Sequence, residues 1–245
     1  MGARVSVTPM KAAIITGAGS GIGRATALQF AKQNYHVFLL GRDARKLRLT
    51  HLDCGDATSI ACDLTKTEDV DQAVRQILNS NKTLEVLVNN AGTFTYKPFD
   101  QTPDEDWMDQ FMIHVMGAVR LTRALWPTFV RQKKGSIVNV SSTLGVRPTV
   151  QTSAYSAMKA AQVNWTQTLA LEGAIHQIRV NCVCPGIVDT PIHPEGAIRS
   201  MQQAQPLGRV GQPQEIAQAV YFLATESSAW TTGAVLHVDG GINLA

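Results

Sequence analysis

The sequence predicts one α/β domain, a Rossmann-type, doubly wound parallel sheet flanked by helices. Short runs rich in β-branched residues alternate with longer stretches of helical period along the whole chain. Parallel strands need long crossover connections, so this alternation favours strand–helix–strand units wound in one direction. A length of 245 residues suits one domain of this class with a sizeable core.

The elements are expected in regular order. Residues 1–10 form an N-terminal tail, and residues 11–245 form the domain. Helices fill the intervals between strands, among them Ala154–Glu172. The proline-rich stretch at about 187–207 is expected to be a substrate lid, because loops at the carboxyl ends of strands carry ligand sites in this fold. The predicted strands are Ala12–Thr16, Val37–Leu40, Ser59–Ala61, Leu84–Asn89, Ser136–Ser141, Arg179–Val183 and Ala234–Val238.

Composition excludes several classes of partner. The net charge of +3 is small and its positive residues are scattered, which argues against nucleic acid or a membrane surface. No apolar run reaches the length of a membrane span and residues 1–10 contain no apolar signal core, so we expect a cytoplasmic protein. The four cysteines show no CxxC spacing, which favours buried, reduced thiols and no metal site.

A glycine-rich turn follows the first predicted strand and opens a helix. Gly17, Gly21 and Gly23 would let backbone approach a phosphate closely, while the N–H groups from Ser20 to Gly23, including that of Ile22, face it at the positive end of the helix dipole. The spacing differs from the common G-x-G-x-x-G fingerprint. The alternative is a tight turn without a ligand.

The order of the motifs resembles the short-chain dehydrogenase/reductase family over residues 11–245. This resemblance implies hydride transfer between a nicotinamide cofactor and a carbonyl/alcohol pair. It further implies that Asp63 and Leu64 contact adenine, and that Asn90, Ala91 and Gly92 support the sheet and the cofactor ribose. The matching segments are Thr16–Gly23, Asp63-Leu64, Asn89-Asn90-Ala91-Gly92, Tyr155-x3-Lys159, Pro185-Gly186 and Val238-Asp239-Gly240-Gly241.

The end of the second strand decides between the two nicotinamide cofactors. An acidic residue there would bind the ribose 2′-hydroxyl, whereas a guanidinium suits a 2′-phosphate. Arg42 therefore predicts a preference for NADP(H) over NAD(H). In the alternative, Arg42 begins an exposed charged helix face and Asp43 contacts the ribose.

Tyr155 and Lys159 are one helical turn apart and project from the same face. A neighbouring ammonium is expected to lower the pKa of the phenol. By resemblance, Lys159 also holds the nicotinamide ribose, and Tyr155 gives or takes the proton of the substrate oxygen. Without the preceding motifs, an aromatic ring packed over a lysine stem would explain the pair.

Ser142 lies just past the fifth predicted strand and faces the same cleft, where its hydroxyl could orient the substrate carbonyl. Ser141 is chemically equal, but strand alternation turns it to the opposite side. The family spacing also selects Ser142.

His114 departs from the family pattern, which usually has an asparagine there that bends the helix and anchors a water beside the lysine. Histidine can donate, accept and titrate near neutral pH, so it either sustains a modified proton relay or packs as a satisfied core residue.

After the sixth strand, Val188 and Thr190 resemble the segment that pins the nicotinamide carboxamide. A Pro-Gly turn without a ligand is the alternative for this segment.

Three functions follow from these expectations. The leading one is an NADP(H)-dependent reductase or dehydrogenase acting on a neutral, apolar carbonyl/alcohol compound. The second is a 3-oxoacyl-acyl-carrier-protein reductase, resembled through Gly208–Gly211, although Lys133 and His176 stand where those enzymes present arginines to the carrier protein. The third is a cofactor-binding regulator with weak catalysis, suggested by His114. The apolar pocket is expected to include Phe94, Leu144, Val146, Ile187, Ile192 and Ile198.

By resemblance, the chain forms a homotetramer or a homodimer. The family assembles through its fourth and fifth helices and its C-terminal segment. Met112–Trp126 and Ala160–Leu171 have the apolar content that such an interface requires.

Overall fold

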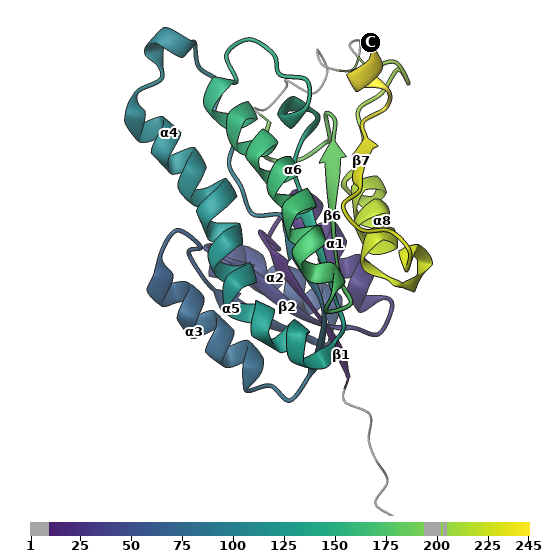
Figure 1. The fold of residues 1–245 in the computed structure, drawn as a ribbon. Helices are drawn as coiled ribbons and strands as arrows, with labels where there is room; N and C mark the ends of the chain where they lie inside the picture. The colour runs from purple at the N-terminus through teal and green to yellow at the C-terminus, as the bar shows by residue number, and fades with distance from the viewer. Residues whose placement is uncertain (1–9, 194–201, 203–204) are drawn as a thin grey trace, which may run out of the picture.

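Seven parallel strands form one sheet in the computed structural model, which describes residues 10–193, 202 and 205–245 (Figure 1). The strand order is β3-β2-β1-β4-β5-β6-β7, so the chain reverses its direction of travel across the sheet between β1 and β4. The strands are β1 (Lys11–Thr16), β2 (His36–Gly41), β3 (Ala57–Ala61), β4 (Thr83–Asn89), β5 (Gly135–Val140), β6 (Ile178–Pro185) and β7 (Val235–Val238).

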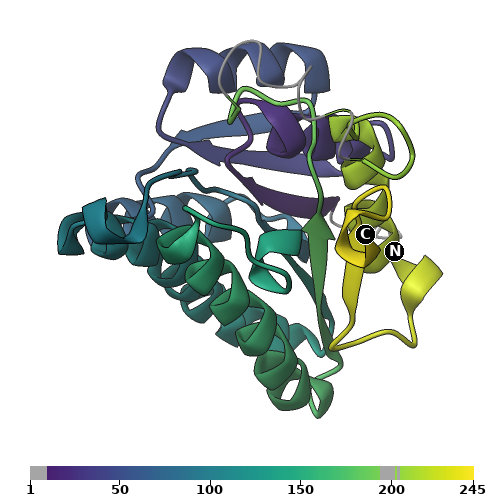
Figure 2. The same ribbon diagram turned by 90° about the horizontal axis from the view of Figure 1, so that it is seen from above.

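Helices cover both faces of this sheet (Figure 2). One layer contains α1, α2 and α8, and the other contains α3, α5 and α6, with α4 against α6. A π-turn, η2, joins α4 to α5. The helices are α1 (Gly21–Ala31), α2 (Ala44–Cys54), α3 (Thr67–Leu78), α4 (Asp104–Phe111), η2 (Met112–Met116), α5 (Gly117–Gln132), α6 (Ser153–Ala174) and α8 (Pro213–Ala224), with short 3-10 turns η1 (Phe99–Gln101), η3 (Thr143–Gly145), η5 (Glu226–Ser228) and η6 (Ile242–Leu244).

Alternate residues of the strands supply two cores. Ala12 and Ile14 of β1 pack with α3, α5 and α6, while Ala13 and Ile15 pack with α1, α2 and α8. Because both faces are covered, the central strands are apolar on both sides, as a parallel sheet requires. The predicted fold class is therefore confirmed, and all seven predicted strands are present. Residues 1–9 of the expected tail, and residues 194–201 and 203–204 of the expected lid, which include Ile198, lie outside the described residues.

A chain of buried polar side chains ties the sheet to one helix layer. Asn89 of β4 donates to Asn139 of β5 at 2.9 Å and to Thr122 of α5 at 3.1 Å. Asn139 in turn donates to the Thr166 hydroxyl of α6 at 2.8 Å. All four side chains are buried, so each depends on the others for its hydrogen bonds.

Within the described ranges, no helix is both long and apolar enough to cross a bilayer, and no three or more His, Cys, Asp or Glu residues are grouped to hold a metal. Cys62, Cys182 and Cys184 are buried, and Cys54 is partly buried. The sulfur atoms of Cys182 and Cys184 lie 3.9 Å apart, too far for a disulfide bond.

Asn139→Val should destabilise the fold by about 2–6 kcal/mol, because Asn89 and Thr166 each lose a buried partner at about 1–3 kcal/mol apiece. Ile137→Val in the same strand removes only a methylene and should cost about 1 kcal/mol. Urea unfolding of both variants measures the two free energies. Equal losses would show that the buried polar chain contributes nothing beyond packing.

Candidate active site

The predicted site residues lie at the carboxyl ends of the parallel strands, around the reversal point between β1 and β4. In open α/β sheets this crevice is where ligands bind. Here it contains a cavity of about 130 Å³. The wall of the cavity includes Gly17, Leu40, Gly41, Arg42, Cys62, Leu64, Ala91, Gly92, Thr93 and Ile113.

The glycine-rich turn between β1 and α1 is as tight as its sequence predicts. Gly17 and Gly21 have φ angles of +67° and +51°, which disfavour other residues. A Cβ on Gly23 would lie 2.2 Å from the Gly17 carbonyl oxygen. Ser20 makes no side-chain cap on α1, and the first turn, which includes Ile22, contains no acidic residue. The turn thus has uncapped N–H groups and no bulk in front of them, which fits a pyrophosphate.

Thr16 and Asn90 clamp β1 to β4 at the reversal point. The Thr16 hydroxyl donates to the Val88 carbonyl at 3.2 Å and accepts from the backbone N–H groups of Asn90 and Ala91, at 2.9 and 3.0 Å. The Asn90 side chain donates to the Thr16 carbonyl at 2.9 Å. The sequence predicted Asn90, Ala91 and Gly92 at this place, but not the part that Thr16 plays.

The π-turn η2 carries His114, whose side chain is buried. Its Nε2 lies 2.8 Å from the Thr93 carbonyl oxygen, so this nitrogen bears the proton. Burial, and then the charge of Lys159, lower the His114 pKa well below its usual value, which keeps the ring neutral. The ring meets Tyr155 edge to face at 5.3 Å, and a Cβ on Gly92 would lie 2.4 Å from it.

The second and third strands end in a cluster of charges. Arg42 is exposed, and Asp43 caps α2 by accepting from the N–H groups of Arg45 and Lys46 at 3.0 and 3.2 Å. Burial raises the pKa of Asp63, but hydrogen bonds from Thr65 and the charge of Arg42 lower it overall, so Asp63 is ionised. Leu64 beside it lines the cavity. Both of these hydrogen bonds reach Asp43 Oδ1, and of the two neighbouring residues only Arg42 lines the cavity.

Tyr155, Ser142 and Lys159 meet at the next strand ends. A hydrogen bond with Ser142 lowers the pKa of Tyr155 in part, but burial dominates and raises it to about 12. Lys159 Nζ lies 5.6 Å from the centre of the Tyr155 ring. The expectation that Lys159 lowers the Tyr155 pKa is wrong for this arrangement, because desolvation outweighs a charge whose hydrogen bonds point elsewhere.

Lys159 is held from two sides. Its Nζ donates to the Val140 carbonyl and to the Gln162 side chain, each at 2.9 Å, and burial lowers its pKa to about 8. Ser141 donates to the Lys159 backbone carbonyl at 2.8 Å, so its hydroxyl is turned away from Tyr155 as strand alternation predicted. Gln162 was not among the site residues predicted from the sequence. A polar residue three positions after Lys159, on the same buried helix face, was the available signal.

The segment after β6 returns to the glycine-rich turn. Val188 is buried and pairs with Gly211 in an isolated parallel bridge. Thr190 packs on Gly21, where an added Cβ would lie 3.1 Å from the Thr190 methyl carbon. Thr190 therefore lies next to the turn that fits a pyrophosphate, and Val188 lies two residues before it.

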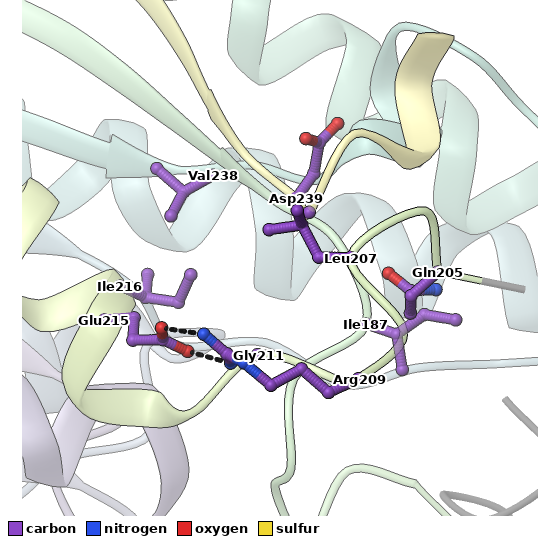
Figure 3. A pocket seen from close by; sticks show the side chains of 10 residues that line it. Ile187, Gln205, Leu207, Arg209, Gly211, Glu215, Ile216, Val238 and Asp239 are labelled. Carbon is purple, nitrogen blue, oxygen red and sulfur yellow. Dashed lines mark hydrogen bonds and ion pairs between the residues drawn. The ribbon is translucent and has the colours of Figure 1, made fainter. Parts of the chain in front are cut away.

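A second cavity of about 130 Å³ lies between the residues after β6, the start of α8 and the end of β7 (Figure 3). Ile187, Gln205 and Asp239 line it. The Arg209 guanidinium binds both oxygens of Glu215 at 2.6 and 2.8 Å, and Glu215 also accepts from the Gln212 N–H at 2.7 Å. This network fixes the loop that enters α8.

Phe94, another expected pocket residue, lies beside Tyr155 and meets it edge to face, with the ring centres 4.9 Å apart.

The chain is similar in sequence to known reductases and dehydrogenases over nearly its whole length. The family model described as enoyl-(acyl carrier protein) reductase matches residues 17–243. A 3-oxoacyl-(acyl-carrier-protein) reductase of Thermotoga maritima is 35% identical over 241 residues, which cover 95% of this chain and 97% of the relative. An L-fucose dehydrogenase of Oryctolagus cuniculus is 34% identical, with 96% and 85% covered.

Two solved structures are similar throughout. The 3-ketoacyl-(acyl-carrier-protein) reductase of Brucella melitensis, complexed with NADH, has a TM-score of 0.92 and 33% identity, and the match covers 96% of this chain and 99% of that one. A variant of the actinorhodin polyketide ketoreductase with NADPH has a TM-score of 0.92 and 31% identity, with 96% and 98% covered.

Gly23→Ala should lower the free energy of unfolding by about 1–3 kcal/mol through overpacking against Gly17 and Asn90. Alanine within a helix is otherwise favoured over glycine by about 1 kcal/mol, so the sign of the change is diagnostic. Gly211→Ala is the matched control, since its added Cβ would meet nothing closer than 3.5 Å. A melting temperature of Gly23→Ala equal to or above that of the unsubstituted protein would contradict the close contact.

Proposed function

Because the chain belongs to the short-chain dehydrogenase/reductase family of nicotinamide-dependent oxidoreductases, we propose that Tyr155, Ser142 and Lys159 are its catalytic residues. The observation that supports this most is the meeting of the three side chains beside a crevice whose glycine-rich turn fits a pyrophosphate. A binding-only regulator has no physical need for all three.

Each side chain has one task in this proposal. The bound nicotinamide supplies or accepts the hydride. In the direction of reduction, the Tyr155 hydroxyl gives its proton to the substrate oxygen, and in oxidation it takes that proton back. Ser142 hydrogen-bonds the carbonyl oxygen and orients it toward Tyr155. Lys159 would hold the cofactor against the substrate, so that hydride and proton reach the same carbonyl group.

Other residues would hold the cofactor. The turn from Gly17 to Gly23 would take the pyrophosphate, Asp63 and Leu64 the adenine, and Asn90 to Gly92 the ribose side of the crevice. Lys159 would hold the nicotinamide ribose. Val188 and Thr190 would pin the nicotinamide carboxamide, and the contact of Thr190 with Gly21 supports this placement.

His114 has a supporting place in this scheme. Its ring is neutral, packs against Tyr155 and donates to the Thr93 carbonyl, which favours packing over a titrating relay. We therefore assign His114 to shaping the site rather than to transferring the proton.

Tyr155→Phe should lower turnover at least about a hundredfold, because it removes the only hydroxyl assigned to proton transfer. NADPH binding should change by less than about threefold, since the ring remains. Nicotinamide absorbance with a panel of ketones, aldehydes, quinones and a 3-oxoacyl thioester measures the rate.

Tyr221→Phe, on α8 in the opposite helix layer, removes a hydroxyl remote from the crevice and serves as the control. Full activity of Tyr155→Phe would refute the assignment of the proton donor. Cofactor binding without turnover anywhere on the panel would favour the regulator.

We propose that the cofactor is preferentially NADP(H). Arg42 is exposed and lines the cavity, whereas Asp43 does not line it and accepts two helix-capping hydrogen bonds at Oδ1. A guanidinium can bind a 2′-phosphate through two hydrogen bonds, which NAD(H) does not offer. Lys46, whose stem lies against Gly19, adds positive charge nearby.

Arg42→Ala should weaken NADPH binding about tenfold or more, because a charge-assisted hydrogen bond is lost. NADH affinity should change by no more than about twofold. Quenching of protein fluorescence by each cofactor gives the dissociation constants. Arg45→Ala removes the same charge from the first turn of α2 and serves as the control. Equal effects of the two variants would show that Arg42 contributes only general electrostatic attraction.

The substrate is proposed to be a neutral, apolar carbonyl or alcohol compound. Phe94 beside Tyr155, with Leu144, Val146, Ile187 and Ile192, would form the apolar wall, and residues 187–207 the lid. A 3-oxoacyl thioester is the second candidate, favoured by the similarity to the Thermotoga maritima reductase. Turnover of the thioester well above that of free ketones would favour the second candidate.

We also propose that the protein is a cytoplasmic homo-oligomer, either a tetramer or a dimer.

A further inference from the structure

Gln162 occupies a buried position between α6 and the π-turn η2. In this turn the Gly117 N–H reaches back five residues to the Met112 carbonyl. The Gln162 side chain crosses from α6 and donates from Nε2 to the His114 carbonyl at 2.8 Å. Only 2% of Gln162 is exposed, so this hydrogen bond has no competition from water.

The other end of the same carboxamide holds the buried ammonium of Lys159. Gln162 Oε1 accepts from Lys159 Nζ at 2.9 Å, and Val140 accepts a second hydrogen bond from it. An ammonium has three donors, so one remains for the crevice. The two contacts also fix the orientation of the carboxamide, because the reverse one would set its NH₂ group against the ammonium and its oxygen against the carbonyl.

We propose that Gln162 is a positioning residue for the reaction, linking the Lys159 ammonium directly to the π-turn that carries His114. This inference rests on the proposed function of Lys159. A carboxamide does not titrate near neutral pH, so the link holds the charged group in place without relaying a proton. The other titratable groups around Lys159 are Tyr155, His114, Cys182 and Cys184.

Two substitutions change the link in opposite ways. Gln162→Met keeps the volume but removes the acceptor, so the ammonium is less stabilised and the Lys159 pKa should fall by about one unit. Gln162→Glu places a carboxylate beside the ammonium, so this pKa should rise by a similar amount, about one unit. Damage to packing alone would move both variants in the same direction.

The Lys159 titration can be followed by NMR in protein that contains lysine labelled with carbon-13 at Cε. The Lys159 resonance is identified by its absence in Lys159→Met. In the kcat/KM profile for reduction, activity at high pH is lost as the ammonium deprotonates. This limb should move to lower pH in Gln162→Met and to higher pH in Gln162→Glu, and kcat of Gln162→Met should fall about tenfold.

Gln132→Met is the matched control. Gln132 donates to the Leu84 carbonyl at the far end of α5, so its loss should leave the Lys159 resonance and the pH profile unchanged. Shifts of the Lys159 pKa in the same direction, or none, in both Gln162 variants would overturn the proposal. The NMR titration needs no turnover, so opposite shifts in a protein that fails the Tyr155→Phe test would uphold the link and reject the proposed chemistry.

Discussion

The Thr16 hydroxyl is the point on which the site depends. It lies where β1 and β4 diverge, and it serves two backbone N–H groups and one carbonyl at once. Asn90 closes the connection from the other strand. Since Gly17 and Gly23 pack against Asn90, the tight turn, the crevice floor and the start of α1 all take their positions from this clamp. A parallel sheet opens here because its crossovers leave in opposite directions.

A second set of polar contacts connects the sheet next to the reversal point with helix α6. The buried side-chain hydrogen bonds from Asn89 through Asn139 reach Thr166 on α6. The Thr166 hydroxyl in turn donates to the backbone carbonyl of Gln162 at 2.7 Å. The helix that carries Tyr155 and Lys159 is thereby registered against the sheet by hydrogen bonds, whose geometry is stricter than that of apolar packing. Burial there also disfavours the charged forms of both groups, raising one pKa to about 12 and lowering the other to about 8.

Most of the fold could be predicted because hydrophobic periodicity and glycine spacing are local signals. Ser142, Tyr155 and Lys159 were selected by the resemblance to a known family, and strand alternation separated Ser141 from Ser142. The Tyr155 pKa could not be predicted, since it depends on burial by distant segments. The π-turn at His114 and the carboxamide of Gln162 were missed for a related reason. A polar residue on the buried face of α6 was a local signal for Gln162, but its partner lies 48 positions away and the local sequence does not identify it.

The contact between Gly92 and His114 constrains how this site can evolve. With the imidazole in place, a Cβ at position 92 would lie 2.4 Å from Cε1, so the glycine cannot be exchanged while the histidine remains. Conversely, a smaller residue at 114 would leave a void against the Tyr155 ring and remove the restraint on position 92. The two positions therefore form one mutational unit. A sequence with a side chain at position 92 would have to gain the glycine before the histidine or together with it.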